Sequence, residues 1–473
     1  MNRLRVSLTS FLALGICALS AALRAESPRN TPTVELIRSL KDGVVAVFSE
    51  GKDGTMAGSG SVIHESGYIL TNNHVVEDRA GEVLFADGTV LPYILFGRLT
   101  EKDLAIIKVS PERPCARIPL GRSHDLMAGE PVVVMGNPGG RGLVFSSGIL
   151  SSPGIIMDAA NALVMARFRD SARDRYLQFD ATSNRGNSGG PLINAEGSQI
   201  GVVTLKDPRE DNTNYAIPVD RVRACLPDLL APEERFQLWL GIKVNMLGGT
   251  AVVAAVEKDS PANKAGVREG DIIVAAERQP VRDPIDWLLV LCEAREKKPF
   301  AMTVQRAGHN IDLEIERAAY PQPKLELAES KKPGLQYALY HADHLRKLPD
   351  FATLKPIKTG VTADLNPEPL AGERQEDYAL VYEGFLQLDQ DGFQRLVVSS
   401  DDGARLWLDG RLVIEDPGPH APQEASGPIR VQPGLHRLRI EYYNGAGAAE
   451  LKLFLRPNGG WQREVTAAEL FHE

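Results

Sequence analysis

Residues 184–191 read Asn184-Arg185-Gly186-Asn187-Ser188-Gly189-Gly190-Pro191, and this stretch decides the fold that we expect. Glycines on both sides of Ser188 leave its hydroxyl accessible and let backbone N–H groups converge on one point. Such a turn can hold an oxyanion, because preorganised N–H donors stabilise the negative charge that develops during acyl transfer. We therefore predict that Ser188 is a nucleophile and that the oxyanion donors are among Gly186, Asn187 and Ser188.

A serine hydroxyl needs a base that takes its proton, and an earlier segment supplies one. His74 follows a strand-like run, Tyr68-Ile69-Leu70. The imidazole needs an acceptor that fixes its tautomer, and Asp103 opens the apolar run 104–109. Taken singly, the three residues could be a turn, a core histidine and a solvated strand end. Their order, with separations of 29 and 85 residues, favours a catalytic triad of His74, Asp103 and Ser188.

The N-terminus has the pattern of an export signal. Arg3 and Arg5 precede an apolar run, Leu8–Leu23, and the small residue Ala25 suits a signal peptidase. We predict a signal peptide over 1–25 and a periplasmic or extracellular mature chain. An uncleaved membrane anchor, which would keep the chain at the cell envelope, is the alternative.

Composition excludes several classes of protein. A length of 473 residues predicts about three domains. The formal charge is −9, and loss of the three arginines of the signal makes it −12. Nucleic-acid affinity rests on basic residues, so this class is excluded. The mature chain keeps only three widely spaced cysteines, which argues against a disulfide framework or a zinc site.

Turn residues and strand-like runs predict a mainly β chain of several units. Short β-rich runs fill residues 34–230. A second β-rich unit with one helix-like stretch covers 236–318, a proline- and charge-rich linker covers 319–333, and a third unit of alternating strands covers 334–473.

Residues 34–318 resemble the HtrA/Deg family of trypsin-like serine proteases. The resemblance rests on four motifs: Gly58-Ser59-Gly60-Ser61, Thr71-Asn72-Asn73-His74-Val75-Val76, Asp103-Leu104-Ala105 and the stretch 184–191. It implies a chymotrypsin-like pair of β-barrels and endoproteolysis of unfolded or damaged proteins through an acyl-enzyme, without a metal or cofactor. It also implies that Val144–Ser151 is a strand leading into a regulatory loop.

Two further expectations follow from this resemblance. Trypsin-like cleavage after Lys or Arg needs a carboxylate six positions before the nucleophile, where this chain has Thr182. The pocket is therefore expected to favour small or medium apolar side chains. Related proteases trimerise through aromatic residues near the mature N-terminus, and Glu26–Asp42 contains none. Whether the chain forms a homo-oligomer stays open.

The second unit resembles the PDZ domain that follows such proteases, through Trp239-Leu240-Gly241-Ile242 and the segment 260–271. In these domains a peptide adds as an extra strand and backbone N–H groups receive its carboxylate. The resemblance implies that Leu240, Gly241 and Ile242 bind the C-termini of substrate proteins. The alternative is that these residues only shape turns.

The third unit resembles the protective-antigen-type β-sandwich, through Ser400-Asp401-Asp402-Gly403, Trp407-Leu408-Asp409-Gly410 and Pro433-Gly434-Leu435-His436. In glycan-binding members the paired aspartates hold calcium, an ion that prefers oxygen ligands. Asp401 and Asp402 match that pair, and Asn444 is a further candidate ligand. A plain turn in a spacer or docking module is the alternative.

Two classes of function thus compete. One is a serine endopeptidase with accessory recognition domains. The other is a non-catalytic cell-surface scaffold that binds peptide or glycan. A scaffold is expected to have lost at least one residue of the triad or of the oxyanion turn. All of them are present in this chain, which favours the enzyme.

Overall fold

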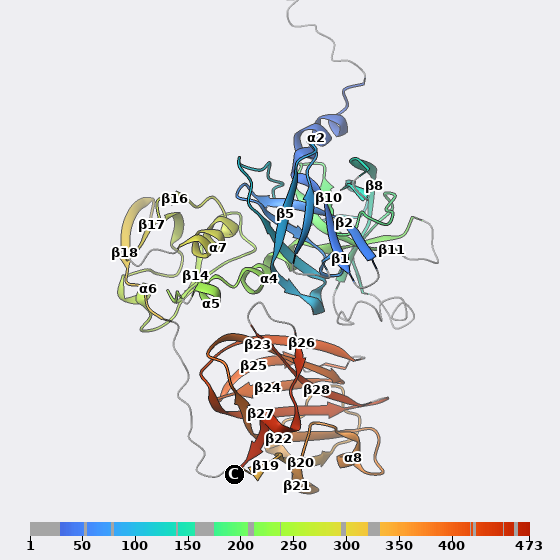
Figure 1. Ribbon diagram of the computed structural model, residues 1–473, viewed down its shortest axis with the longest axis vertical. Coiled ribbons are helices and arrows are strands. Elements are labelled where there is room, and N and C mark those ends of the chain that lie inside the picture. Colours follow the sequence, from blue (N-terminus) through green and yellow to red (C-terminus); the bar gives the residue numbers. More distant parts are fainter. Residues whose placement is uncertain are drawn as a thin grey trace, which may run out of the picture.

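The computed structural model describes three bodies. In Figure 1 the N-terminal body, in blue and green, lies above the C-terminal body, in orange and red, and the middle body, in yellow, lies to the left of the first. The described residues are 29–51, 54–76, 80–138, 141–156, 175–206, 212–236, 238–294, 299–319, 332–416, 418–419, 422–447, 449–457 and 462–473. The predicted signal peptide and most of the predicted linker, residues 320–331, lie outside them.

The first body begins with a closed six-stranded antiparallel barrel in the order β1-β2-β3-β6-β5-β4. Its strands are β1 (Val44–Gly51), β2 (Gly54–His64), β3 (Tyr68–Thr71), β4 (Ala80–Leu84), β5 (Val90–Leu99) and β6 (Leu104–Val109). Alternate residues such as Val45, Val47, Ile69 and Ile107 fill the interior, because successive side chains of a strand point to opposite faces.

A second closed barrel follows in the order β10-β11-β12-β9-β8-β7. Its strands are β7 (Pro131–Gly136), β8 (Val144–Ile156), β9 (Arg175–Phe179), β10 (Pro191–Asn194), β11 (Gln199–Lys206) and β12 (Asn214–Pro218). Helix α2 (Pro32–Leu40) precedes the first barrel, and α4 (Val219–Leu230) and α5 (Pro232–Phe236) follow the second. The predicted chymotrypsin-like double barrel is therefore confirmed.

The second body is a small domain of two sheets and two helices. Its sheets are β13 (Ile242–Val244) with β14 (Val253–Val256), and β16 (Gln279–Pro280), β15 (Ile272–Ala276), β17 (Phe300–Arg306) and β18 (His309–Ile315). Its helices are α6 (Pro261–Lys264) and α7 (Pro284–Glu293). Asp283 caps α7, since its side chain accepts from two N–H groups of the first turn.

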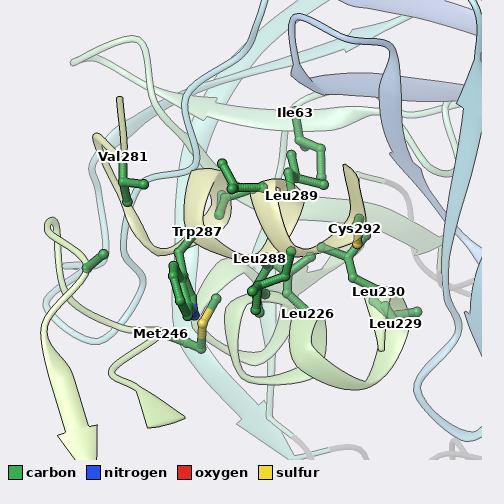
Figure 2. Close-up of a cluster of buried hydrophobic side chains, with 14 of the residues drawn as sticks. Ile63, Leu226, Leu229, Leu230, Met246, Val281, Trp287, Leu288, Leu289 and Cys292 are labelled. Carbon is green, nitrogen blue, oxygen red and sulfur yellow. The ribbon is translucent and has the colours of Figure 1, made fainter. Parts of the chain in front are cut away.

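Helix α7 is buried along its length, because α4 and α5 of the first body and Ile63 of β2 pack against it in addition to its own sheet. All residues from Pro284 to Cys292 are buried. Figure 2 shows Leu288 beside Leu226 of α4, and Leu289 beside Ile63 of β2. One continuous hydrophobic core therefore joins the second body to the first.

Charged groups border this apolar junction. Arg117, from the segment between the two barrels, donates to the carboxylates of Asp283 and Asp286 at the start of α7. Burial alone would raise the pKa of Asp286, but hydrogen bonds from Arg282 and the nearby Arg117 outweigh burial and lower it. Asp286 is thus an anion in a site that protein cations neutralise.

The third body is a sandwich of two antiparallel sheets around a separate core. The larger sheet contains β19 (Lys332–Pro333), β20 (Leu335–His341), β21 (Lys358–Thr362), β22 (Tyr378–Leu388), β24 (Ala404–Leu408), β25 (Arg411–Asp416), β27 (Gly434–Asn444) and β30 (Leu470–His472). The smaller contains β26 (Gln423–Val431), β23 (Gly392–Asp401), β28 (Glu450–Pro457) and β29 (Arg463–Glu464). Tyr382 of the larger sheet and Leu396 of the smaller sheet both lie in this core.

The chain is therefore mainly β, as predicted, with a C-terminal sandwich. In the described part of the chain, Cys115, Cys225 and Cys292 take part in no disulfide. Within the same residues, no helix has the length and apolar character that crossing a bilayer requires.

Candidate functional site

His74 and Asp103 meet at one end of the first barrel. His74 lies in a 3-10 turn, Asn73–Val75, directly after β3, and Asp103 ends the turn Thr100–Lys102 before β6. Because β3 and β6 pair, the two turns lie side by side. Nδ1 of His74 is 2.9 Å from both carboxylate oxygens of Asp103. A carboxylate only accepts, so Nδ1 is the donor in this contact.

Asp103 is held firmly in this position. It adopts a left-handed conformation with φ of 50°, which aspartate tolerates better than most residues. Its carboxylate also accepts from the backbone N–H of His74 at 3.0 Å. The side-chain amide of Asn72 donates to its carbonyl at 2.9 Å. The carboxylate is therefore fixed in orientation and mostly shielded from water.

Thr204 of β11 completes this line from the second barrel. Its hydroxyl donates to Asp103 Oδ2 at 2.8 Å, and its backbone carbonyl accepts from the hydroxyl of Ser188 at 3.2 Å. One residue thus contacts both the acid and the predicted nucleophile. Sequence reasoning missed Thr204, because no local motif marks it within strand β11.

Ser188 lies on the turn between β9 and β10 that the sequence singled out. Gly186 and Gly189 have φ of +100° and +84°, values that glycine adopts freely. A Cβ on Gly189 would lie 2.2 Å from the hydroxyl oxygen of Thr71. The glycines therefore let the turn pass close to the first barrel at Ser59 and Thr71.

The N–H groups of this turn divide into two kinds. That of Asn187 donates to the carbonyl of Asn184 at 3.0 Å and so closes the turn. Among the described residues, the N–H groups of Gly186 and Ser188 have no hydrogen-bond acceptor. Of the three predicted oxyanion donors, these two are the ones that remain available to a ligand.

Two other predicted features lie near the serine. Thr182 is exposed and carries no charge, consistent with a pocket that does not select basic side chains. The predicted strand 144–151 is part of β8. Residues 157–174, where the sequence predicts a regulatory loop, lie outside the described residues.

The predicted carboxylate loop of the second body is tied to the segment after β14. Leu240 is fully buried, and its carbonyl accepts from the N–H of Ala262. Gly241 has φ of +76°, and a Cβ there would lie 2.3 Å from Cβ of Ser260. Ile242 begins β13. The glycine is therefore required by the turn itself, whatever the loop binds.

The paired aspartates of the third body lie at the end of β23. Asp401 and Asp402 are joined by a cis peptide bond and are mostly buried. The N–H of Gly445 donates to Asp402 Oδ2 at 2.8 Å, which brings the neighbouring Asn444 to the aspartates. Asn444 is fully buried, and within the described residues its Oδ1 has no hydrogen-bond partner.

Two six-stranded barrels, with a histidine–aspartate pair on one and a serine turn on the other, define the class of trypsin-like peptidases. Comparisons with known proteins agree with this class. The trypsin-like peptidase domain matches residues 58–202, the PDZ domain residues 239–316 and the PA14 domain residues 331–467.

Two curated relatives point the same way. A "Probable periplasmic serine endoprotease DegP-like" of Rhizobium meliloti is 32% identical over 57% of this chain and 55% of the relative. A "Putative serine protease HhoA" of Synechocystis is 30% identical over 56% of this chain and 71% of the relative. A serine endoprotease structure from Yersinia pestis is 27% identical, with a TM-score of 0.37, and covers 63% of this chain and 100% of that one.

The chain belongs to the HtrA/DegP family of trypsin-like serine proteases. It spans about half the length of the first curated relatives that it matches. The third body corresponds to the PA14 domain match at residues 331–467.

Proposed function

We propose that the chain is an extracytoplasmic serine endopeptidase that cleaves unfolded or damaged proteins. The observation that carries this proposal is the hydrogen-bonded line from Thr204 through Asp103 to His74. It fixes the orientation of the imidazole through Nδ1, and Nε2 would then act as the general base. The periplasmic assignment of the named DegP-like relatives supports the location.

The proposed reaction proceeds by acyl transfer. Ser188 Oγ turns from the Thr204 carbonyl toward His74, gives its proton to Nε2 and bonds to the scissile carbonyl carbon. The N–H groups of Gly186 and Ser188 stabilise the oxyanion. His74 then protonates the leaving amine as the C–N bond breaks. Water, deprotonated by His74, hydrolyses the acyl-enzyme and restores Ser188.

Hydrolysis of casein by the wild type and by Ser188→Ala tests this proposal. Loss of the nucleophile is expected to lower the rate by about 10⁴-fold or more. Equal rates would contradict it. A fluorophosphonate probe separates the competing class, because a non-catalytic peptide- or glycan-binding scaffold would stay unlabelled.

We also propose that Leu240, Gly241 and Ile242 receive the C-terminal carboxylate of a substrate peptide. The position of the loop supports this role, since it leads directly into β13, the strand beside which a peptide would add. Binding of a fluorescent C-terminal peptide, but not of its amidated form, is the expected result.

For the PA14 domain we propose calcium and, through it, glycan binding. The supporting observation is the buried Oδ1 of Asn444, which has no hydrogen-bond partner among the described residues, while the N–H of the next residue, Gly445, donates to Asp402. A buried oxygen of this kind needs a donor or a cation. The described residues contain no group of three or more acidic, histidine or cysteine ligands. The remaining ligands would therefore be amide or backbone oxygens.

Calcium dependence of stability tests this site. A ligand at 100 times its Kd stabilises a folded domain by about 2.7 kcal/mol. Calcium is therefore expected to raise the melting temperature of the wild-type PA14 domain but not that of Asp402→Asn. Asp391→Asn, at an exposed aspartate of the same domain, is the control and should respond like the wild type. No calcium response in the wild type would sink the proposal.

A further inference from the structure

Ser59 is a buried serine of β2 whose polar groups all bond to segments around the candidate site. Its hydroxyl donates to the carbonyl of Gly186 at 2.6 Å and accepts from the N–H of Asn137 at 2.9 Å. Its N–H donates to the carbonyl of Ser188 at 2.8 Å. Its own carbonyl accepts from the hydroxyl of Thr71. Ser59 itself has no exposed surface.

Three glycines of the second barrel make room for this serine. A Cβ on Gly136 would lie 3.1 Å from Ser59 Oγ, and one on Gly190 would lie 3.2 Å from Ser59 Cβ. A Cβ on Gly189 would lie only 2.2 Å from the Ser59 carbonyl oxygen. The second barrel is therefore shaped so that the serine turn can close on Ser59.

We infer that Ser59 is a positioning residue for the oxyanion hole, an inference that rests on the proposed peptidase function. The two available donors are the N–H groups of Gly186 and Ser188. Ser59 donates a hydrogen bond to the backbone carbonyl of each of these residues. Its hydroxyl donates to the carbonyl of Gly186, and its N–H donates to the carbonyl of Ser188.

The conformational freedom of glycine makes this restraint important. Gly186, at φ of +100°, has no side chain to limit its rotation. A bond to its carbonyl restricts ψ and thereby the direction of its N–H relative to Ser188. Oxyanion stabilisation depends on donors that are already oriented before the reaction. Removing the hydroxyl therefore weakens transition-state binding without removing a donor.

The same hydroxyl also connects the site to strand β7. Asn137 directly follows β7, and its N–H is the donor to Ser59 Oγ. A displacement of this strand end would weaken the hydrogen bond that the Ser59 hydroxyl accepts from Asn137. It would thereby also weaken the hydrogen bond that the same hydroxyl donates to Gly186. The orientation of the oxyanion donors is thus coupled to the second barrel through one side chain.

Ser59→Ala tests the inference, with Ser61→Ala as its matched control. Ser61 lies two residues further on the same strand and is equally buried, and its hydroxyl has no hydrogen-bond partner among the described residues. For Ser59→Ala we expect kcat on a peptide substrate to fall about 10- to 100-fold, less than the 10²–10³ that deletion of an oxyanion donor costs. KM should change by less than about twofold, because the lost interaction is made in the transition state.

Two further readouts distinguish positioning from general damage. The affinity for a peptide boronic acid, which forms a tetrahedral adduct, should fall by the same factor as kcat. The pH profile of kcat/KM should not move, because the His74–Asp103 pair is untouched. Active sites are counted with the fluorophosphonate probe, so that kcat refers to folded enzyme. Ser59→Cys, which keeps the size but replaces the hydroxyl by a weak donor, provides a second variant and should also lower kcat.

The outcomes separate the two proposals. A wild type that neither cleaves casein nor takes the probe refutes the peptidase function itself. With an active wild type, kcat values for Ser59→Ala or Ser59→Cys equal to that of Ser61→Ala overturn the inference. A loss that appears only in KM, or a shifted pH profile, overturns it as well.

Discussion

The hydroxyl of Thr204, in the second barrel, is hydrogen-bonded to Asp103, at the end of the first barrel, and this bond gives a first prediction. Thr204→Val keeps the shape of the side chain but removes the hydrogen bond to Asp103 Oδ2. A hydrogen bond to a charged group contributes about 1.5–3 kcal/mol. We therefore expect kcat/KM to fall roughly 10- to 100-fold, whereas Thr204→Ser, which keeps the hydroxyl, should stay near the wild type. Peptide hydrolysis measures both, and equal activity of the two variants would contradict the role.

The residues that sequence reasoning found and missed differ in how local their signal is. Ser188 was found because glycines surround it in the chain, and His74 because a strand and a turn precede it. Thr204 and Ser59 act through hydrogen bonds to residues about one hundred positions away or more. No spacing rule marks such contacts, because they depend on how the barrels meet. The motif around Ser59 supported the family resemblance but did not reveal what its hydroxyl does.

At the scale of elements, strands and helices were easier to predict from the sequence than the way in which they pack against one another. The third unit was predicted to consist of alternating strands, and β22 is one of them. The one helix-like stretch predicted for the second unit corresponds to α7. What the prediction lacked was the burial of α7 on all sides. A signal for it was present, because a helix that is apolar all round is a buried helix. No prediction was made of the elements that pack around this helix.

His436 of β27 gives an element-scale prediction of pH dependence. Its Nδ1 is 2.7 Å from Asp409 Oδ2, in the turn between β24 and β25, and its Nε2 is 2.8 Å from the carbonyl of Gln432. Burial lowers the pKa of His436, but the bonds to Asp409 and Gln432 outweigh burial and raise it above 6.5. A raised pKa stabilises the fold fully at pH below the ordinary value. That stabilisation is lost as pH rises through the folded-state pKa.

Urea unfolding of the PA14 domain measures this effect. Between about pH 6 and pH 9, the free energy of unfolding of the wild type should decline more than that of His436→Gln, which cannot titrate. His341→Gln, at an exposed histidine of β20 in the same domain, should follow the wild type through this alkaline range. Parallel curves for the wild type and His436→Gln would show that the imidazole is not the titrating group.

On the scale of the whole molecule, the three bodies are joined unequally. The trypsin-like and PDZ domains share one core, which extends from Ile63 to Ile315. The PA14 domain has its own core, from Leu335 to Leu470. Between this domain and the barrels, Arg395 is 3.7 Å from Asp228 of α4, whose side chain is 49% exposed. The Arg395 side chain is 13% exposed, so one partner of this pair is mostly buried and the other is exposed. The sequence could predict three units but not this difference, since contacts between domains leave no periodic pattern.

A chain truncated after Ala319 should therefore fold and keep the proposed peptidase activity. Casein hydrolysis is expected within about twofold of the full chain, because truncation leaves the shared core of the first two bodies intact. The truncated Ser188→Ala variant sets the background rate. The PA14 domain does reach the turn Thr100–Lys102, which precedes Asp103. A truncated chain that melts normally but cleaves slowly would therefore mean that this contact positions Asp103, and that the PA14 domain belongs to the catalytic unit.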